Sequence, residues 1–351
     1  MNASSEPVFH PIIPPHILDK LATSDDPLMH EPARRTLEHD STIRHRRLVA
    51  PTGGGPASTS PAGSDSPNRV IFDARHLHTL PGHEIRTEAA APGKDAAANR
   101  AYNALGATFD FYLKVYGRHS LDGAGLPLNA SVHYGQGYGN AFWDGEQMIF
   151  GDGDGHVFRD FTNCIDVIGH ELTHGVTQHT AKLEYYGQPG ALNESVSDVF
   201  GSLIKQYSLG QTADQADWLI GVDLLGPDFD GALRSLKAPG TAYDDPHLGK
   251  DPQPATMDDF VKTPRDNGGV HINSGIPNRA FYLVASALGG HAWERAGKIW
   301  YGTLTGGNLA SDASFATFAR QTAATARNLF GDGDETQAVL KAWAQVGVPC
   351  S

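Results

Sequence analysis

Two histidines and a glutamate within one pentapeptide are the residues of this chain best suited to metal chemistry. His170 and His174 are four residues apart. On a helix, residues at that spacing lie on one face, so both imidazoles can bind a single zinc ion. Glu171 lies between them in the sequence, beside the first imidazole, and can take a proton. A chain with 17 histidines can contain such a pentapeptide by chance, so residues elsewhere must complete the site.

The third ligand has to come from another part of the chain. A structural zinc site closes with a fourth protein ligand, often cysteine, whereas a catalytic site keeps three and leaves a position for water. Neither Cys164 nor Cys350 has a CxxC partner, which sets a cysteine-rich structural site aside. Thr177 and Thr180 occupy the glycine and histidine positions of an HExxHxxGxxH motif, so that scheme fails. His179, one residue short, is interpreted as an ordinary polar residue near a helix end.

A glutamate on a following helix is the alternative. Glu194 comes twenty residues after His174, and Asp198 lies four residues beyond it on the same helix face. One carboxylate can bind the metal while the next accepts the N–H of a ligating imidazole and fixes its tautomer. We therefore assign Glu194 to zinc and Asp198 to His170. A solvated helix face would also carry two acids, but apolar neighbours make this segment amphipathic and partly buried, and buried acids need partners.

The elements that carry these residues follow from hydrophobic spacing. Ile165, Ile168, Leu172 and Val176 recur at helical intervals, and Asn163 is the expected N-cap of this zinc helix. Short strands with Gly- and Asn-rich turns dominate residues 70–155, apart from a helix near 95–116. Further helices are expected at 277–289, 291–305, 311–329 and 335–346. The fold class is α+β, with a β-rich lobe at 69–184 that includes the zinc helix and a helical lobe at 185–351.

The order and gaps of the longer motifs resemble the thermolysin family of zinc metallopeptidases, the gluzincins, over about residues 70–348. The matching pieces are Asn140-Ala141-Phe142-Trp143, Gly151 to Gly155, the His170 to His174 helix, Tyr185, Asn193 to Asp198, Arg234, and Asp266 to Gly275. The resemblance implies a two-lobed thermolysin-like fold with the zinc helix at the cleft. It also implies one catalytic zinc ion, held by His170, His174 and Glu194.

The same resemblance implies the catalytic roles. Glu171 takes a proton from a zinc-activated water that attacks a peptide carbonyl, and later passes it to the leaving amine. Tyr185 and His271 donate hydrogen bonds to the oxyanion that forms. Asp266 orients His271 and favours its protonated form.

Substrate contacts are implied in the same way. Asn140 and the backbone of Ala141 match the family's edge-strand contacts to an extended peptide, and Arg234 matches the arginine that binds a substrate carbonyl on the primed side. The positions aligned with the main specificity pocket are apolar, although most could equally be generic core: Phe158, Phe161, Val167, Ile220, Leu224 and Leu233. We expect a preference for a bulky apolar residue just after the scissile bond.

The first 68 residues differ in composition from the rest. Residues 51–68 are rich in Gly, Ser and Pro and are expected to form a flexible linker or processing region. Ahead of them, residues 12–18 are expected to be an extended anchor that enters a short helix, and residues 33–47 a second helix. A disordered tail is the alternative. The Ile-Pro-Pro anchor and the arginine-rich helix resemble the short propeptide of the protealysin-like branch, which keeps the enzyme inactive until it is cut.

We therefore interpret residues 1–50 as a propeptide that acts in cis. Self-cleavage is expected between Arg47 and Val70, with Arg47–Leu48 and Leu48–Val49 as attractive bonds.

Calcium is where the chain departs from the family pattern. Asp166 and Asp217 are present, but Lys205, Leu219 and Val222 stand where acids are expected. A double-calcium site is therefore not expected, although calcium binding itself stays open, and the Lys205 ammonium can partly neutralise the two acids. The Asp152 and Asp332 loops lack the glycine and glutamate of an EF-hand and are interpreted as turns.

Composition limits the classes of partner. Forty acidic against 27 basic residues give a net charge of −13, which disfavours nucleic acid and anionic membranes. No apolar run approaches the ~20 residues that cross a bilayer, and residues 1–10 show no standard secretory signal. We expect either secretion by a non-standard route or retention in the cytoplasm as a precursor. Peptide and protein substrates are the expected partners, with a protein inhibitor as a further possibility.

Three functions are compatible with these motifs. The first is a zinc endopeptidase made as a zymogen. The second is a catalytically silent zinc-binding or adhesion protein, and the intact Glu171, Tyr185 and His271 argue against it. The third is a zinc hydrolase that acts on small amides, which digestion of a protein substrate would distinguish from the first.

Overall fold

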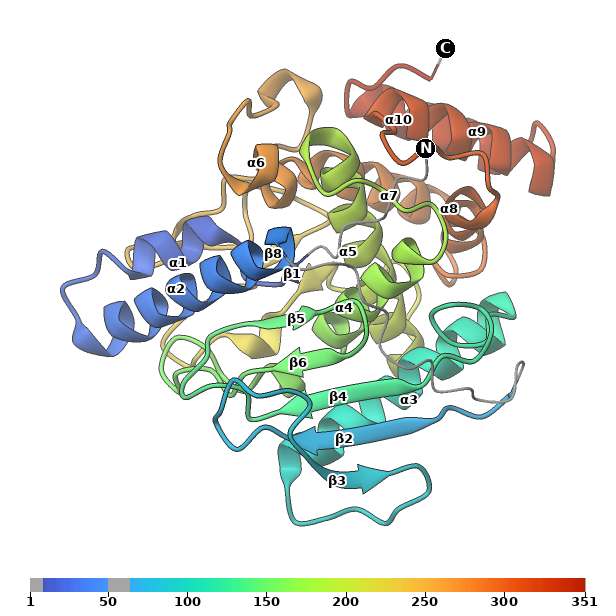
Figure 1. Ribbon diagram of the computed structural model, residues 1–351. Helices are drawn as coiled ribbons and strands as arrows, with labels where there is room; N and C mark the ends of the chain where they lie inside the picture. The colour runs from blue at the N-terminus through green and yellow to red at the C-terminus, as the bar shows by residue number, and fades with distance from the viewer. Residues whose placement is uncertain (1–8, 50–63, 351) are drawn as a thin grey trace.

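A six-stranded mixed sheet forms the β-rich lobe in the computed structural model, which describes residues 9–49 and 64–350 (Figure 1). The strand order is β1-β5-β6-β4-β2-β3, and the pairs β2–β4 and β4–β6 are parallel. The strands are β1 His10–Pro11, β2 Arg69–Asp73, β3 His83–Thr87, β4 Leu128–Val132, β5 Ala141–Trp143 and β6 Met148–Phe150. The edge of the sheet beside β5 is therefore occupied by β1, a strand from residues 9–49, the N-terminal segment.

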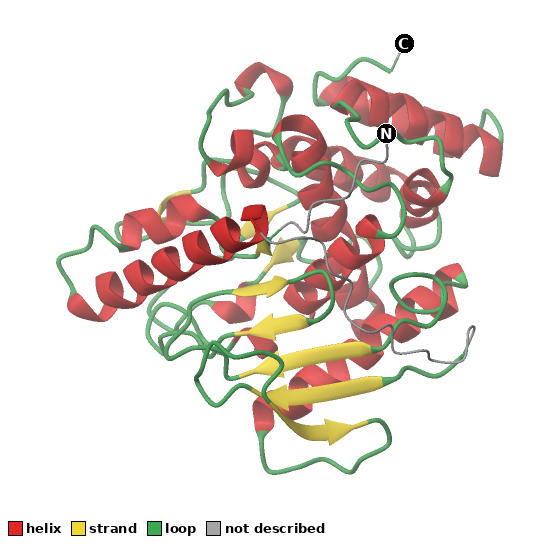
Figure 2. Cartoon of the chain, viewed as in Figure 1, coloured by secondary structure: helices red, strands yellow, loops and turns green. Residues whose placement is uncertain are grey.

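Helices α3 and α4 pack against the sheet, and the helices from α5 to α10 form the second lobe (Figure 2). They are α3 Ala96–Tyr116, α4 Ile165–Gln178, α5 Gly187–Leu209, α6 Asp266–Asn273, α7 Gly275–Leu288, α8 Ala296–Thr305, α9 Phe315–Phe330 and α10 Asp334–Gln345. Short pairs of strands lie between α5 and α6: β7 Leu219–Ile220 with β8 Arg234–Ser235, and β9 Asp244–Asp245 with β10 Gly249–Lys250. The two-lobed α+β architecture expected from the sequence is confirmed.

Helices α4 and α5 pack against each other, and two glycines set how closely they approach. A Cβ on Gly201 would collide with the carbonyl oxygen of Asp166 and would lie 3.1 Å from the backbone nitrogen of His170. On the facing side, a Cβ on Gly169 would collide with the side chain of Ile204 and would lie 3.3 Å from the Cα of Gly201. The backbones can therefore come close enough for short side chains on one helix to face those on the other.

The start of α4 differs from the expectation. The N-cap is Cys164, without a side-chain cap, and Asn163 ends a short 3₁₀ turn at 161–163. The residue that caps this region is Asp160, whose carboxylate accepts the N–H of Thr162. The expected N-cap at Asn163 is therefore wrong.

The N-terminal segment folds into two helices that lie side by side and project from the body (Figure 1). Helix α1 spans Pro15–Leu21, as the anchor pattern suggested, and α2 spans Pro27–Val49. The second helix begins six residues before the expected start at 33 and includes Pro32. The helix starts early because Asp26 caps its N-terminus, a cap that the sequence analysis overlooked. The carboxylate of Asp26 accepts the N–H of Leu28 at 2.9 Å.

The expected processing region is only partly described. Residues 50–63 of the linker lie outside the described residues, and 64–68 lead into β2 without regular structure. The two bonds suggested for self-cleavage, Arg47–Leu48 and Leu48–Val49, lie in the last turn of α2 rather than in a loop.

Two of the C-terminal helices begin later than expected. Residues 291–295 form a turn before α8, whose N-cap is Arg295. Gly289 and Gly290 both adopt positive φ and end α7. Residues 311–314 form a turn before α9, whose N-cap Ser314 accepts the N–H of Thr317. Within the described part of the chain, no helix has the length and apolar character needed to cross a bilayer.

Candidate metal centre and active site

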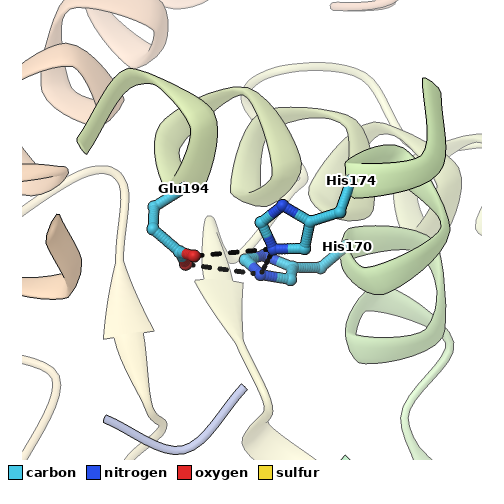
Figure 3. Close-up of side chains that lie close together, drawn as sticks. All are labelled: His170, His174 and Glu194. Atoms are coloured by element: carbon cyan, nitrogen blue, oxygen red, sulfur yellow. Dashed lines mark hydrogen bonds and ion pairs between the residues drawn. The ribbon is translucent and has the colours of Figure 1, made fainter. Parts of the chain in front are cut away.

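Three fully buried side chains converge where α4 and α5 face each other (Figure 3). His170 and His174 come from successive turns of α4, and their Nε2 atoms are 3.1 Å apart. Glu194, from α5, places its Oε2 3.5 Å from the Nε2 of His170 and its Oε1 3.5 Å from the Nε2 of His174. The ligand atoms of the three residues all lie within 4.8 Å of one another.

This donor set fits zinc. Two imidazoles and a carboxylate are the ligands of one common class of catalytic zinc site. Oε2 of Glu194 is buried and has no hydrogen-bond partner among the described residues, which is a cost unless a cation binds there. His170, His174 and Glu194 therefore form a possible zinc site.

Hydrogen bonds on the outer side of each imidazole fix its tautomer. The Nδ1 of His170 lies 2.8 Å from Oδ1 of Asp198, and the Nδ1 of His174 lies 2.9 Å from Oδ1 of Asn193. Both acceptors are on α5. With the proton held at Nδ1, each Nε2 presents its lone pair to the shared centre, as metal binding requires.

Asp198 also holds the arginine that the sequence singled out. Nε and Nη2 of Arg234 donate to the Asp198 carboxylate at 2.8 to 3.0 Å, and Nδ2 of Asn278 donates to its Oδ2 at 2.9 Å. Burial opposes the charged form, but the Arg234 guanidinium and the His170 hydrogen bond outweigh it and lower the pKa of Asp198 to about 2. The carboxylate is thus charged throughout the ordinary pH range.

Glu171 points its carboxylate into the same buried space. Its Oε2 accepts the backbone N–H of Trp143, in β5, at 2.9 Å. Its Oε1 has no hydrogen-bond partner among the described residues. Burial raises the pKa of Glu171 well above its usual range, with the Glu194 charge adding to the effect and His170 opposing it. A carboxylate with a raised pKa is a better proton acceptor, so the structure allows Glu171 to act as a base.

Tyr185, His271 and Asp266 form a connected group in contact with Glu194. The Tyr185 hydroxyl donates to Oε1 of Glu194 and lies 3.3 Å from Nε2 of His271. The Asp266 carboxylate contacts Nδ1 of His271 at 2.5 Å and accepts its backbone N–H at 2.8 Å. Burial lowers the pKa of His271, but the charges of Asp266 and Glu194 outweigh it, so the pKa is raised.

A segment from the start of the chain passes through this site. Ile12 donates its N–H to the carbonyl of Ala141 at 3.1 Å and accepts Nη1 of Arg234 at 3.1 Å. The N–H of Ile13 donates to Oδ1 of Asn140 at 3.0 Å. The carbonyl of the preceding residue, Pro11, lies 3.1 Å from Nε2 of His271. The residues expected to bind substrate backbone thus bind the N-terminal segment.

Comparison with known proteins agrees with this geometry. Residues 65–178 match the model of the thermolysin metallopeptidase catalytic domain, and residues 181–348 match its alpha-helical domain. The chain belongs to the thermolysin family of metallopeptidases. It is accordingly a thermolysin-like metalloprotease, and the family's members are zinc enzymes.

Individual relatives of this thermolysin-like protein cover nearly all of it. An extracellular metalloprotease of Pectobacterium carotovorum subsp. carotovorum is 51% identical over 96% of both chains. Protease PrtS of Photorhabdus sp. (strain Az29) is 48% identical over 96% of this chain and 91% of its own length. Among solved structures, the precursor of protealysin, a metalloproteinase from Serratia proteamaculans, is 52% identical with a TM-score of 0.88. That match covers 97% of this chain and 99% of the other.

The six apolar residues expected to line the specificity pocket of this metalloprotease are all buried. They belong to the main hydrophobic core: Phe158, Phe161, Val167, Ile220, Leu224 and Leu233. Ile12 of the N-terminal segment is fully buried in the same core. Burial alone does not separate a pocket wall from ordinary core, so their role stays a prediction.

The two acids considered for calcium in the sequence, Asp166 and Asp217, both contact a lysine. Nζ of Lys205 lies 2.8 Å from Oδ2 of Asp217 and 3.4 Å from Oδ2 of Asp166. Burial raises the pKa of Asp166, and the Lys205 charge opposes that rise. The ammonium therefore contacts both acids, as the sequence suggested.

Two residues near the site were missed by sequence reasoning. His10 stacks on His174 with ring centroids 4.2 Å apart and meets Tyr185 edge-on at 4.1 Å. Asn278 contacts Asp198 from α7. The position of His10 two residues before the Ile12 anchor was a usable signal, because an anchored strand carries its neighbours into the site. No spacing in the sequence indicates that Asn278 faces Asp198.

Proposed function

We propose that this metalloprotease is a zinc-dependent endopeptidase made as a zymogen, and that it cleaves peptide bonds on the N-terminal side of bulky hydrophobic residues. The observation that carries the proposal is the placement of the buried Glu171 beside the His170, His174 and Glu194 cluster, with one carboxylate oxygen that has no hydrogen-bond partner among the described residues. A purely structural metal site has no need of an additional buried acid at that point.

The chemistry assigned to the chain's own residues follows from that arrangement. A zinc ion at the cluster would supply Lewis-acid activation of a water molecule and of the substrate carbonyl. Glu171, held by the Trp143 N–H, takes the proton of the attacking water and delivers it to the leaving amine. Tyr185 and His271 donate hydrogen bonds to the oxyanion, and Asp266 holds His271 in its protonated form.

Substrate is proposed to bind as an added strand on β5. Asn140, Ala141 and Arg234 offer one amide oxygen, one carbonyl and one guanidinium to an extended backbone, as they do to Ile12 and Ile13. The apolar residue after the scissile bond would take the place of Ile12, in a pocket with Phe158, Phe161, Val167, Ile220, Leu224 and Leu233 as its walls. The full burial of Ile12 supports this preference.

The N-terminal segment is proposed to be an inhibitory propeptide, residues 1–50, joined by the 51–68 linker to the β-rich and helical lobes at 69–184 and 185–351. Its occupation of Asn140, Ala141, Arg234 and His271 supports inhibition, because substrate would need the same atoms. The similarity to a protealysin precursor supports synthesis as a zymogen. The cut is proposed to be made by the enzyme itself between Arg47 and Val70.

Extracellular action is part of the proposal, and the name of the Pectobacterium relative supports it. Two locations of the precursor are compatible with this. The precursor either leaves the cell by a route without a standard signal peptide or is retained in the cytoplasm. Fractionation of producing cells, with antibodies against the N-terminal segment and against the catalytic lobes, would separate the two.

Digestion of casein by the purified full-length protein tests the activity. We expect digestion that a zinc chelator abolishes and added zinc restores. N-terminal sequencing of the active species should locate the cut between residues 47 and 70. The Glu171→Gln variant should remain uncut when purified alone and should be cut when wild-type enzyme is added. Casein digestion by Glu171→Gln, or its maturation alone, would contradict the proposed roles.

A further inference from the structure

We propose that the cleft contains an aromatic subsite, formed by Tyr134, Tyr138 and Phe142, that takes an aromatic side chain three residues before the scissile bond. The inference rests on the proposed endopeptidase function and adds a second determinant of substrate choice to it. The N-terminal segment supplies the evidence, because it lies along β5 as a substrate is proposed to lie.

The hydrogen bonds of that segment define its register. His271, proposed to face the carbonyl under attack, contacts the carbonyl of Pro11 at 3.1 Å. Arg234, proposed to bind the next carbonyl on the primed side, contacts that of Ile12 at 3.1 Å. The Pro11–Ile12 bond therefore occupies the scissile position. Counting back from it, His10 is the second residue before the bond and Phe9 is the third.

Phe9 is almost fully buried, at 4% exposed. Its ring meets that of Phe142 edge-on, with centroids 4.8 Å apart and an interplanar angle of 62°. Phe9 belongs to a small hydrophobic cluster separate from the main core, whose other buried members are Ala74, Tyr134, Tyr138, Phe142 and Ile149. Phe9 is the only one of these buried members that the N-terminal segment supplies, so the subsite belongs to the catalytic lobe.

The three rings offer faces and edges suited to another aromatic ring. Tyr134 and Tyr138 both pack edge-on against Phe142, with centroids 5.9 and 6.2 Å away. Edge-to-face contacts add to the free energy of ordinary apolar burial, so an aromatic occupant should bind better than an aliphatic one of similar area. The hydroxyls at the rim hydrogen-bond to His39 and Asp40 of α2. Departure of α2 with the propeptide would therefore uncover this rim.

Strand geometry separates this subsite from the neighbouring position. Successive side chains of a strand point to opposite faces. His10 accordingly turns to the other side of β1 and stacks on His174, while Phe9 contacts Phe142. A preference that arises from this cluster should appear at the third position before the bond and should be absent at the second.

Matched peptides test the subsite with the matured, zinc-loaded enzyme. Each is an acetylated pentapeptide amide in which the variable residue is followed by alanine-alanine-leucine-alanine, with the alanine–leucine bond as the scissile bond. We expect kcat/KM with phenylalanine at the variable position to exceed that with alanine by roughly ten- to thirtyfold, with leucine between them. Mass spectrometry of the products confirms which bond is cut.

Two variants connect the preference to the named rings. Phe142→Leu should lower the phenylalanine-to-alanine ratio at least threefold. Tyr134→Leu should lower the same ratio and serves if the first variant does not fold. Phe330→Leu, in α9, is the matched control and should leave the ratio unchanged.

Each contrary result has its own meaning. Equal rates for phenylalanine and alanine peptides, both cut before leucine, would overturn the subsite and leave the proposed function standing. A preference for phenylalanine at the second position before the bond would overturn the register. Failure to cut any peptide would overturn the proposed function and this inference with it.

Discussion

Replacement of Asp198 by asparagine is the sharpest perturbation of the metal site outside its ligands. The side chain is fully buried and accepts hydrogen bonds from His170, Arg234 and Asn278. Asp198→Asn leaves the Arg234 guanidinium buried without its counter-charge, which typically costs roughly 3–5 kcal/mol. Loss of the carboxylate that orients a ligating imidazole lowers metal affinity by roughly 10–100-fold. A domain stable by about 5–15 kcal/mol should still fold.

Two assays measure the two effects separately. Transfer of zinc to a competing chelator should occur at a roughly 10–100-fold lower chelator concentration for Asp198→Asn than for wild type. Urea unfolding of the metal-free proteins should show the loss of stability. Asp217→Asn is the matched control, because that carboxylate pairs with Lys205 nearer the surface and should cost about 1 kcal/mol or less. Equal zinc retention by the two variants would refute the reasoning.

Two further predictions concern charged groups outside the zinc cluster. His16 in α1 hydrogen-bonds Tyr243 at 2.8 Å, and burial lowers its pKa to about 4, with Asp266 opposing and His271 and Arg234 adding to the effect. The docked imidazole is neutral, so propeptide docking should be strongest above the free value of about 6.5 and should weaken roughly tenfold by pH 5.5. Competition by a peptide hydroxamate for the active site of the full-length Glu171→Gln protein measures this. His16→Gln should remove the acid sensitivity and the control His30→Gln should retain it; an unchanged pH profile in His16→Gln would contradict the assignment. Lys205→Met should lower the free energy of unfolding, measured in urea, by roughly 2–4 kcal/mol, because it removes the charge that Lys205 places beside Asp166. The control Lys237→Met, at an exposed position, should leave the free energy of unfolding unchanged. Similar losses of stability in both variants would show that Asp166 does not need the Lys205 ammonium.

The metal ligands could be anticipated because they depend on local spacing. The prediction of His170 and His174 required only the periodicity of a helix. The prediction of Glu194 and Asp198 required only a second helix with both acids on one face. The close approach of α4 and α5 also depends on single residues within each helix, Gly169 and Gly201. Within each helix these residues lie one or two turns apart, and helical periodicity then fixes which side chains share a face.

Other features depend on contacts between distant parts of the chain. The register of Ile13 on Asn140 joins residues 127 positions apart, and no local pattern fixes it. Asn278 reaches Asp198 across 80 residues. The roles suggested for Tyr185 and His271 came from a family resemblance, because neither residue alone indicates catalysis. The early start of α2 was missed because the Asp26 cap lies outside the hydrophobic pattern that predicted the helix.

X-ray anomalous scattering at the zinc edge, measured on crystals of the zinc-loaded protein, tests the central claim most directly. We expect a single strong peak within about 2.0–2.3 Å of the Nε2 atoms of His170 and His174 and of a carboxylate oxygen of Glu194, with no fourth protein ligand. A peak at another place would contradict the account, as would a fourth protein side chain in the coordination shell, because no position would then remain for the water that Glu171 is proposed to deprotonate.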